Sequence, residues 1–564
     1  MMARKGFMNP HWSRRHFLQG SAALAAAGAY GLHSRRANAA IPMEFDGSKF
    51  QLAATEPNPK SGGVLRYGIT MRPPHLDFHQ SGTINNLGSQ ACMYDNLIRH
   101  DPRDSGQSII PDLAHSWEIS KDGKTYTFFL RKGVHFSDGA LLTSADVKAT
   151  FDRITKPPEG INIPRSALFT SVDEVTAPDD YTVQFKLSAP RPPAFIMGAI
   201  SSGWNGIVRK KTLEDNNYNL RKTLDVPGTG PFRSVRRVEQ EIWVMQKNPD
   251  YWMEGLPYLD GIEFYHGLPF SPELGSAFLA GRTDYARLID PVTRREADAR
   301  DDMTATDYYQ SVIQAVWLNA DREPFNDPRV RRAMHLVFDR PVLVEAVKDV
   351  APMLVGGFIY PFSDVATPTD QLTQRLGYQP DTTASIKEAR ALLEAAGHGG
   401  GMKGLDFVVR DVATFKIWSQ AVQAMLAQAL NIECELRTVV ESVWFDDTNN
   451  GKFDLSVGAI VSTLIDPSDY FNTWYGPNGP QNYSQWEDPR FTDLLAAIDN
   501  EVDPVKRQEA ITAAEMVMEE NPPVLPICWE KINDGWYNYV KGHNPYNYFG
   551  LYDVGRFDTF WLDK

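Results

Sequence analysis

The sequence predicts an α/β protein in which an antiparallel, β-rich unit is combined with at least one βαβ unit. Two observations lead to this fold class. The chain has 564 residues, enough for two to four folding units. Its hydrophobic pattern changes near residue 310, from alternating strands bounded by turns to helices that alternate with strands. The 42% hydrophobic content is normal for a globular protein and excludes wholesale disorder.

The first 39 residues have the pattern of an export signal. An arginine pair precedes an Ala-rich stretch, 20–32, and a small-x-small sequence at 37–39, which resembles a twin-arginine signal peptide with cleavage after Ala39. The signal residues are Arg14, Arg15, Phe17 and Leu18. An uncleaved tail is the alternative. Six Lys and Arg but no Asp or Glu occur before residue 40, so cleavage would lower the net charge from −14 by six units to −20. No cysteine lies near the cleavage site, so we expect a periplasmic protein without a lipid anchor.

The β-rich unit follows residues 40–60, which contain three prolines and are expected to form a loose leader arm. In chain order we predict strands over 64–69, 117–119 and 126–130, a helix over 145–154 and a strand over 181–187. The turn 121–124, with its Asp-Gly pair, joins two of these strands into a hairpin. Thr143 and Asp146 have the spacing of a capping box, which predicts the helix start.

The second half of the chain has a helical rhythm. We predict a helix that begins at Asp327-Pro328, with apolar residues spaced for one face up to Phe338, a helix over 385–396 ended by Gly397, a strand over 405–409, a helix over 415–430 and a strand over 432–439. The last three elements predict a βαβ unit with two parallel strands.

Composition excludes several classes of protein. The excess of acidic residues argues against nucleic acid as a partner, since phosphate binding needs clustered Lys and Arg. No run of about 20 apolar residues occurs after position 40, which excludes a polytopic membrane protein. The three cysteines, Cys92, Cys434 and Cys528, are too few for a disulfide scaffold. Three buried thiols are expected, and one disulfide with a leftover thiol is the alternative.

Common catalytic signatures are absent from the sequence, including zinc-protease, Cys-x-x-Cys, nucleophile-elbow and P-loop motifs. Residues 228–231 (Gly-Thr-Gly-Pro) begin like a dinucleotide loop, but Arg233 replaces the third glycine, so a tight turn between strands is expected instead. His75 and His79 are weak metal-ligand candidates, because the surrounding prolines and glycine favour an extended loop over a helix. We therefore expect no catalytic residue, no metal and no cofactor.

Four stretches in order resemble the extracellular solute-binding proteins of family 5, the dipeptide, oligopeptide and nickel-complex receptors of ABC importers. The first contains Pro111-Asp112-Leu113-Ala114, Trp117, Asp122-Gly123-Lys124-Thr125-Tyr126, Leu130-Arg131-Lys132-Gly133-Val134-His135-Phe136-Ser137-Asp138-Gly139 and Ala145-Asp146-Val147. The others contain Gly228-Thr229-Gly230-Pro231-Phe232 with Asn248-Pro249-Asp250-Tyr251-Trp252; Leu318-Asn319, Pro324-Phe325, Asp327-Pro328-Arg329-Val330-Arg331-Arg332-Ala333 and Asp339-Arg340; and Asp466-Pro467, Tyr470-Phe471 and Asn482-Tyr483-Ser484. The resemblance covers about residues 61–535.

The resemblance implies a two-lobed periplasmic-binding-protein clamshell (type II, cluster C) with an extra β-rich domain inserted in a split lobe. The implied segments are the signal peptide 1–39, the leader arm 40–60, lobe I at 61–92, 223–312 and 530–564, the extra domain at 93–222, and lobe II at 313–529. It further implies a receptor that binds a small polar solute between the lobes and delivers it to an ABC permease and ATPase complex in the inner membrane. We expect a monomer.

By position in the family pattern, the resemblance places ligand contacts in both lobes. The implied ligand-binding residues are His75, Asp77, Trp317, Asn319, Trp444, Thr463, Asp466, Asp469 and Tyr470. For each of them, packing in a core or on a lobe surface is the alternative.

One departure from the family pattern bears on the solute. Peptide receptors of this family carry an acidic residue about three positions before the Asp-Pro pair, where it binds the peptide ammonium. Here residues 462–465 read Ser-Thr-Leu-Ile, without a carboxylate. A buried ammonium without a counter-charge costs several kcal/mol. A peptide or peptide-like compound is the expected class. An opine, a sugar derivative or a nickel chelate is the alternative, unless Asp466 or Asp469 substitutes.

Two other classes of function remain open. An exported enzyme on the same fold would need a nucleophile–base pair or a metal, and the sequence shows neither. A periplasmic chaperone or sensor module would bind long unfolded chains and no tight small ligand.

Overall fold

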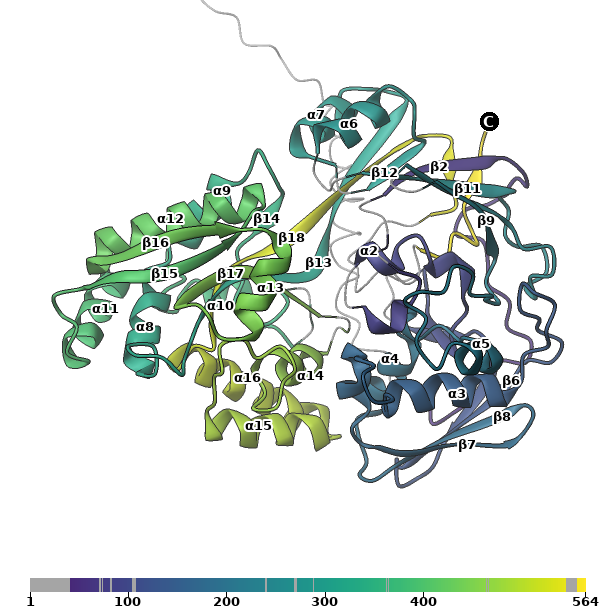
Figure 1. The fold of residues 1–564 in the computed structure, drawn as a ribbon, viewed down its shortest axis with the longest axis horizontal. Coiled ribbons are helices and arrows are strands. Elements are labelled where there is room, and N and C mark those ends of the chain that lie inside the picture. Colours follow the sequence, from purple (N-terminus) through teal and green to yellow (C-terminus); the bar gives the residue numbers. More distant parts are fainter. Residues whose placement is uncertain are drawn as a thin grey trace, which may run out of the picture. The chain divides into compact units, whose positions relative to one another are not determined.

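A computed structural model describes residues 41–69, 73, 75–81, 84–103, 108–238, 241–267, 271–287, 289–361, 363, 365–462, 464, 466–543 and 555–564 (Figure 1). The predicted signal peptide, with Arg14, Arg15, Phe17, Leu18 and the cleavage position Ala39, lies outside the described residues, as does Thr463. No helix in the described part of the chain is long and apolar enough to cross a membrane.

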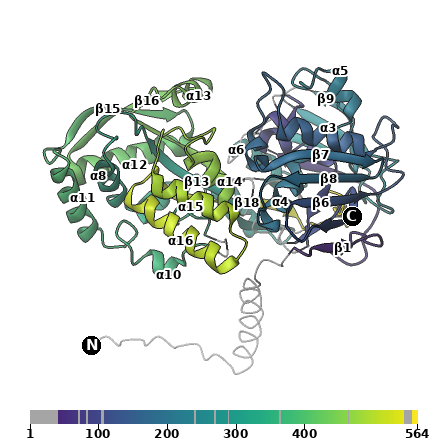
Figure 2. The same ribbon diagram turned by 90° about the horizontal axis from the view of Figure 1, so that it is seen from below.

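The β-rich unit is built on a five-stranded antiparallel sheet with the strand order β1-β5-β6-β8-β7. These strands are β1 (Glu44–Asp46), β5 (Ala114–Ile119), β6 (Thr125–Leu130), β7 (Val172–Asp179) and β8 (Thr182–Leu187). Three helices belong to the same unit: α3 (Ser144–Thr155), α4 (Pro193–Ser201) and α5 (Lys210–Asp215). Figure 2 shows α3 beside β7 and β8. The apolar face of α3 packs into the hydrophobic core of the β-rich unit. The strands β3 (Ile98–His100) and β4 (Ile109–Pro111) form a separate pair.

The larger sheet has eleven strands among the described residues, in the order β16-β15-β17-β13-β18-β12-β2-β11-β10-β9, with β14 on β18. Its strands are β2 (Val64–Ile69), β9 (Phe232–Val238), β10 (Ile242–Lys247), β11 (Gly261–His266), β12 (Tyr285–Arg287), β13 (Met303–Leu318), β14 (Met353–Leu354), β15 (Met402–Arg410), β16 (Ile432–Val439), β17 (Leu455–Val461) and β18 (Val524–Tyr537). A last pair joins β19 (Val540–Lys541) to β20 (Trp561–Leu562).

Helices cover the two ends of this sheet (Figure 1). Those beside β2 and β12 are α2 (Ile84–Leu87), α6 (Pro272–Leu279) and α7 (Pro291–Asp298). The helices of the lobe that contains β15–β17 are α8 (Pro328–Leu336), α9 (Arg340–Ala346), α10 (Thr369–Leu372), α11 (Thr383–Ala395), α12 (Ala413–Leu430), α13 (Glu441–Asn449), α14 (Pro467–Tyr470), α15 (Pro489–Asn500) and α16 (Pro504–Glu520).

Among the described strands, the long strands β13 and β18 are the ones that the two lobes share. One half of their pairing runs from Met303 opposite Tyr537 to Tyr309 opposite Lys531 and adjoins β12. The register then shifts, and pairing resumes from Ile313 opposite Trp529 to Trp317 opposite Val524, beside β17. We call residues 309–314 of β13 and 528–532 of β18 the crossing segment.

Most predicted elements are confirmed. The hairpin forms, α3 has its capping box at Thr143 and Asp146, α11 is followed by Gly397 with φ of 84°, and β15 and β16 are parallel neighbours. The helix at Pro328 ends at Leu336, because Asp339 caps the next helix, so Phe338 lies outside it. All three cysteines are free and buried, as expected.

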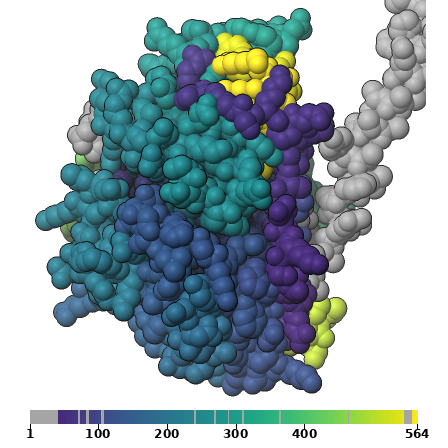
Figure 3. Space-filling model, turned by 90° about the vertical axis from the view of Figure 1, so that its right-hand side faces the viewer, coloured from purple at the N-terminus to yellow at the C-terminus, as the bar shows by residue number. Residues whose placement is uncertain are grey.

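Two predictions are wrong. The arm 40–60 is not loose throughout, since β1 pairs with β5 and Phe45 stacks on Trp117 with ring centroids 4.4 Å apart. Figure 3 shows this first described segment, in purple, lying along the surface. Residues 228–231 are not a turn between strands: they precede β9 and run against residue 93, where a Cβ on Gly228 would lie 1.9 Å from the Met93 carbonyl oxygen. The glycine is therefore needed for close backbone approach.

Candidate functional site

The parallel strands of both lobes point their carboxyl ends toward the crossing segment. β2, β11 and β12 are mutually parallel in one lobe, and β15, β16 and β17 are parallel in the other. Both sets adjoin the β13–β18 pair, which joins them into one sheet. In open α/β sheets, ligands bind outside the carboxyl ends of the strands. The region around the crossing segment is therefore the candidate site.

The lobe I segment after β2 is held by its own polar side chains. Asp77 is fully buried, lies 2.6 Å from the Arg153 guanidinium, and accepts hydrogen bonds from the Leu220 backbone N–H and from Gln80. Burial raises the pKa of Asp77, but the Arg153 charge and the hydrogen bonds from Arg153 and Gln80 lower it more, so the carboxyl group is ionised. These contacts use the carboxylate to anchor the segment on α3, which favours a supporting role over direct contact with a solute.

His75 and His79 have separate partners. The Nδ1 atom of His79 lies 2.7 Å from a donor nitrogen of Arg153, and its Nε2 atom lies 3.0 Å from the Gly206 carbonyl oxygen. Burial and the Arg153 charge lower the pKa of His79 to about 3, so the ring is neutral and both nitrogens are engaged. His75 instead contacts the Asn86 amide at 3.1 Å. Among the described residues no three His, Cys, Asp or Glu side chains are grouped to hold a metal.

Trp317 and Trp444 are brought together in lobe II. Their ring centroids lie 5.8 Å apart, and Trp317 also stacks on Trp474, with Tyr483 packed against both. All four rings are buried in one hydrophobic core. Asn319 lies at the end of β13 and donates hydrogen bonds to the carbonyl oxygens of Gly451 and Phe453. In this arrangement Trp317, Trp444 and Asn319 support the lobe.

The segment from Ser462 to Tyr470 follows the carboxyl end of β17. Asp466 caps α14 through the Ser468 N–H and lies 2.7 Å from Arg507. Asp469 accepts hydrogen bonds from the Ser462 hydroxyl and from the Leu464 N–H, both at 3.0 Å. Tyr470 is buried with its ring in the lobe II core. In this arrangement both carboxylates contact groups of the protein itself and stabilise the segment.

The two halves of the molecule touch directly beside this segment. Leu464 is buried in the hydrophobic core of the β-rich unit, next to α4. Arg191, just before α4, lies 3.1 Å from the Asp499 carboxylate of α15, and both side chains are mostly buried. The Asn472 amide donates to the same carboxylate at 3.2 and 3.1 Å. An ion pair and an apolar contact thus link lobe II to the β-rich unit.

A polar cluster lies where β12, β13 and β18 meet. Asp534 accepts hydrogen bonds from the hydroxyl groups of Tyr285 at 2.7 Å and Tyr308 at 2.6 Å. Burial and the nearby Asp534 charge raise the pKa of both tyrosines. Arg287, at the end of β12, is opposite Asp534 in the strand register. Glu530 lies further along β18, where Gln314 donates a hydrogen bond to it at 3.3 Å.

Sequence reasoning did not identify Arg287, Glu530, Arg191 or Asp499. A signal existed for Glu530, because a carboxylate inside the apolar run 524–532 is unusual for a buried strand. Arg191 and Asp499 are more than 300 positions apart, and the sequence contains nothing that pairs them.

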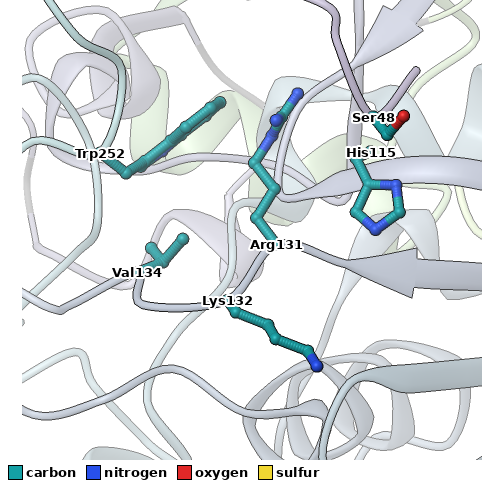
Figure 4. Close-up of a pocket in the computed structure, with 6 residues that line it drawn as sticks. All are labelled: Ser48, His115, Arg131, Lys132, Val134 and Trp252. Atoms are coloured by element: carbon teal, nitrogen blue, oxygen red, sulfur yellow. The ribbon is translucent and has the colours of Figure 1, made fainter.

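Two surface pockets lie away from the crossing segment. One, with a volume of about 340 Å³, is lined by Ser48, His115, Arg131, Lys132, Val134 and Trp252 (Figure 4). Its Arg131 guanidinium lies over the Trp252 ring at 4.7 Å. The other, of about 760 Å³, surrounds the start of α8 and includes Glu323, Asp327, Arg329 and His398. Neither contains a residue of the predicted ligand set.

Comparison with known families decides the classification. The family described as bacterial extracellular solute-binding proteins, family 5 Middle, matches residues 108–482. The chain belongs to family 5 of the bacterial extracellular solute-binding proteins. This family 5 protein is 23% identical to the dipeptide-binding protein DppE of Bacillus subtilis, over 80% of this chain and 84% of DppE. It is 26% identical to the glutathione-binding protein GsiB of Shigella flexneri, over 74% and 80% of the two chains.

Solved structures show the same fold. The periplasmic binding protein DppA from Helicobacter pylori, in complex with the peptide STSA, superposes with a TM-score of 0.76 at 22% identity and covers 90% of this chain and 99% of its own. The binding protein AgaA from A.tumefacien R10, in complex with agropinic acid, also has a TM-score of 0.76 at 22% identity, with 89% and 99% coverage. The family 5 protein therefore has the two-lobed periplasmic-binding-protein fold that the sequence predicted.

Proposed function

We propose that this family 5 protein is the receptor of an ABC importer, which captures a peptide or peptide-like compound between its lobes and passes it to the membrane permease. The observation that carries the proposal is the crossing segment: among the described strands, β13 and β18 join the two lobes, and the parallel strands of both lobes end beside it. Such a joint allows hinge closure around a solute, and ligand then favours the closed form that a permease can distinguish. We propose that the protein binds the solute and does not convert it chemically.

Domain boundaries follow from the same joint. We place the change from lobe I to lobe II at 312/313 and the return at 529/530, with the extra domain at 93–222. The register shift between Tyr309 and Ile313, opposite Lys531 and Trp529, supports these positions. Cys92 and Met93 pack in the lobe I core, while Leu97 and Ile98 pack in that of the β-rich unit. This packing supports a first boundary within a few residues of 93.

We further propose that the twin-arginine machinery exports the protein, that the signal is cleaved after Ala39, and that the mature chain is a periplasmic monomer. They are supported by the Arg14-Arg15 motif and by the absence of a cysteine near the cleavage position. Replacing both arginines by lysine should keep the protein in the cytoplasm with its signal attached. Cell fractionation and the mass of the exported chain test this, and export of the double variant would contradict it.

A non-peptide solute is the second candidate. It is favoured by the internal use of Asp466 and Asp469, which leaves the segment 462–470 without a carboxylate for a peptide ammonium. The fold neighbour in complex with agropinic acid shows that this fold accepts such a ligand.

A thermal-shift screen tests the proposal. The mature protein, Ala40–Lys564, is unfolded and refolded to remove co-purified solute, then mixed with tripeptides, N-blocked tripeptides, opines, oligosaccharides and nickel–histidine. A ligand at 100 times its Kd adds about 2.7 kcal/mol and raises Tm by a few degrees. A shift by any small solute supports the receptor function. Binding of long unfolded chains without a small ligand, or turnover of a panel compound, would contradict it.

A further inference from the structure

Glu530 occupies a position between two hydrophobic cores. On β18, residues 528, 530 and 532 share one face of the sheet because side chains alternate. Cys528 is part of the lobe II core and Ile532 part of the lobe I core, while Glu530 belongs to neither and stays partly exposed. Glu530 therefore lies on β18 between a residue of the lobe II core and a residue of the lobe I core, within the crossing segment.

Glu530 lies beside a second hydrogen-bond acceptor, the side-chain oxygen of Gln314, and makes no ion pair with the described residues. Gln314 on β13 donates one hydrogen bond to Glu530 and is 4% exposed, yet its own carbonyl oxygen has no hydrogen-bond partner among the described residues. Met353 of β14 is opposite Glu530 in the strand register. In the part of the chain that the structure describes, Glu530 makes no salt bridge within 4 Å. An unpaired carboxylate and an unpaired amide oxygen side by side suit a group with several N–H donors.

The other charged groups near this position are engaged elsewhere. Arg287 of β12 lies near enough for its charge to act on Glu530, but burial has the larger effect and raises the pKa of Glu530 to about 7. Lys531 points to the opposite face of the sheet and lies 2.5 Å from Asp307. Arg294 of α7 contacts Asp307 and Asn533. Arg340 of α9 donates a hydrogen bond to the Pro526 carbonyl oxygen. Arg287 is thus a protein cation near Glu530, but no Lys or Arg among the described residues forms an ion pair with this carboxylate, so a directly paired cation would come from a ligand.

We propose that Glu530 and Gln314 bind a cationic nitrogen, an ammonium or a guanidinium, of the solute that this receptor carries. The inference rests on the proposed function and narrows its solute class to compounds with such a group. In this proposal strand β18 supplies the carboxylate that residues 462–465 lack.

Matched probes that differ in one charge test this inference. The probes are trialanine and N-acetyl-trialanine, and arginine and citrulline. We expect at least one cationic member to bind at least tenfold more tightly than its neutral partner, measured by calorimetry on refolded protein. In Glu530→Gln this preference should disappear. Glu433→Gln, on the edge strand β16, should retain it, because Glu433 forms an exposed ion pair with Lys403.

Two further measurements separate recognition from a structural role. Glu530→Gln should not lower the Tm of the ligand-free protein, because it removes a charge that burial disfavours. A bound cation favours the ionised form of Glu530, so the affinity for a cationic probe should be retained above pH 7. It should fall about tenfold from pH 7 to 5.5, as Glu530 becomes protonated. The Glu530→Gln variant should show no such loss. Neutral probes that bind as well as cationic ones, an unchanged preference in Glu530→Gln, or failure of every cationic probe would overturn the inference. Tight binding of a neutral solute would still leave the receptor function intact.

Discussion

At the scale of single residues, the Asp77–Arg153 pair is expected to stabilise the fold, since neither side chain is exposed. Asp77→Asn would leave the Arg153 guanidinium buried without a counter-charge, which costs about 3–5 kcal/mol. Urea unfolding of the variant measures this loss. Asp152→Asn, on the same helix but in an exposed pair with Lys148, should cost less than about 0.5 kcal/mol. Equal losses in both variants would argue against the buried pair as the cause.

Buried neutral histidines predict an acid-sensitive fold. Burial lowers the pKa of His79 and of His543 to about 3 each. Because the unfolded chain binds these protons near pH 6.5 and the folded chain does not, stability is complete above pH 6.5 and falls as the pH drops below it. Each histidine should contribute a loss of about 1.4 kcal/mol per pH unit. Urea unfolding between pH 8 and 5 measures the slope.

The corresponding control replaces both rings. In a His79→Gln, His543→Gln double variant the slope below pH 6.5 should become shallower, even though stability at pH 8 falls. A slope equal to that of the unchanged protein would assign the acid sensitivity to other groups.

At the scale of elements, strand β1 is expected to contribute to the stability of the β-rich unit. Phe45→Ala removes a ring that stacks on Trp117 at 4.4 Å, and we expect a loss of about 1–2 kcal/mol, less than for a fully buried phenylalanine. Met43→Ala, one residue before β1 and 41% exposed, is the matched control. Protease resistance of residues 41–60 reads out the same docking. No change in Phe45→Ala would mean that backbone pairing alone holds the strand.

Prediction from sequence succeeded for elements whose signals are local. These signals act within a few residues, so the local sequence is enough to predict the element. Examples are the capping box of α3, the glycine after α11 and the alternation of buried and exposed side chains in β8. Prediction failed for β1, because a three-residue strand has no period to read, and its stability comes from pairing with β5, some 70 positions away.

The site was less predictable than the elements, and for the same reason. Position in the family pattern identified the segment 462–470 and the aromatic residues of lobe II. It could not show that Asp466 and Asp469 are used internally, since Arg507 and the Leu464 N–H reach them only through folding. Nor could it identify Glu530, whose place is set by the bulged register of β13 against β18.

At the scale of the whole molecule, the contact between Arg191 and Asp499 is expected to stabilise the closed form without touching the solute. The pair is 3.1 Å apart and mostly buried, and it links α15 of lobe II to the β-rich unit beside the buried Leu464. Apparent affinity scales with the fraction of protein in the binding-competent state, so a less stable closed form weakens every ligand equally. Arg191→Ala and Asp499→Ala should therefore each raise Kd by roughly 3- to 10-fold.

A double-mutant cycle with two chemically different ligands tests this expectation. The two substitutions should be non-additive, because they break one interaction, and the factor should be the same for both ligands. Small-angle scattering should show a more open ligand-free protein in either variant. Lys186→Ala, which breaks an exposed pair with Glu174 inside the β-rich unit, should change neither Kd nor scattering. A factor that differs between the ligands would mean that Arg191 or Asp499 contacts the solute, and the pair would then belong to the binding site.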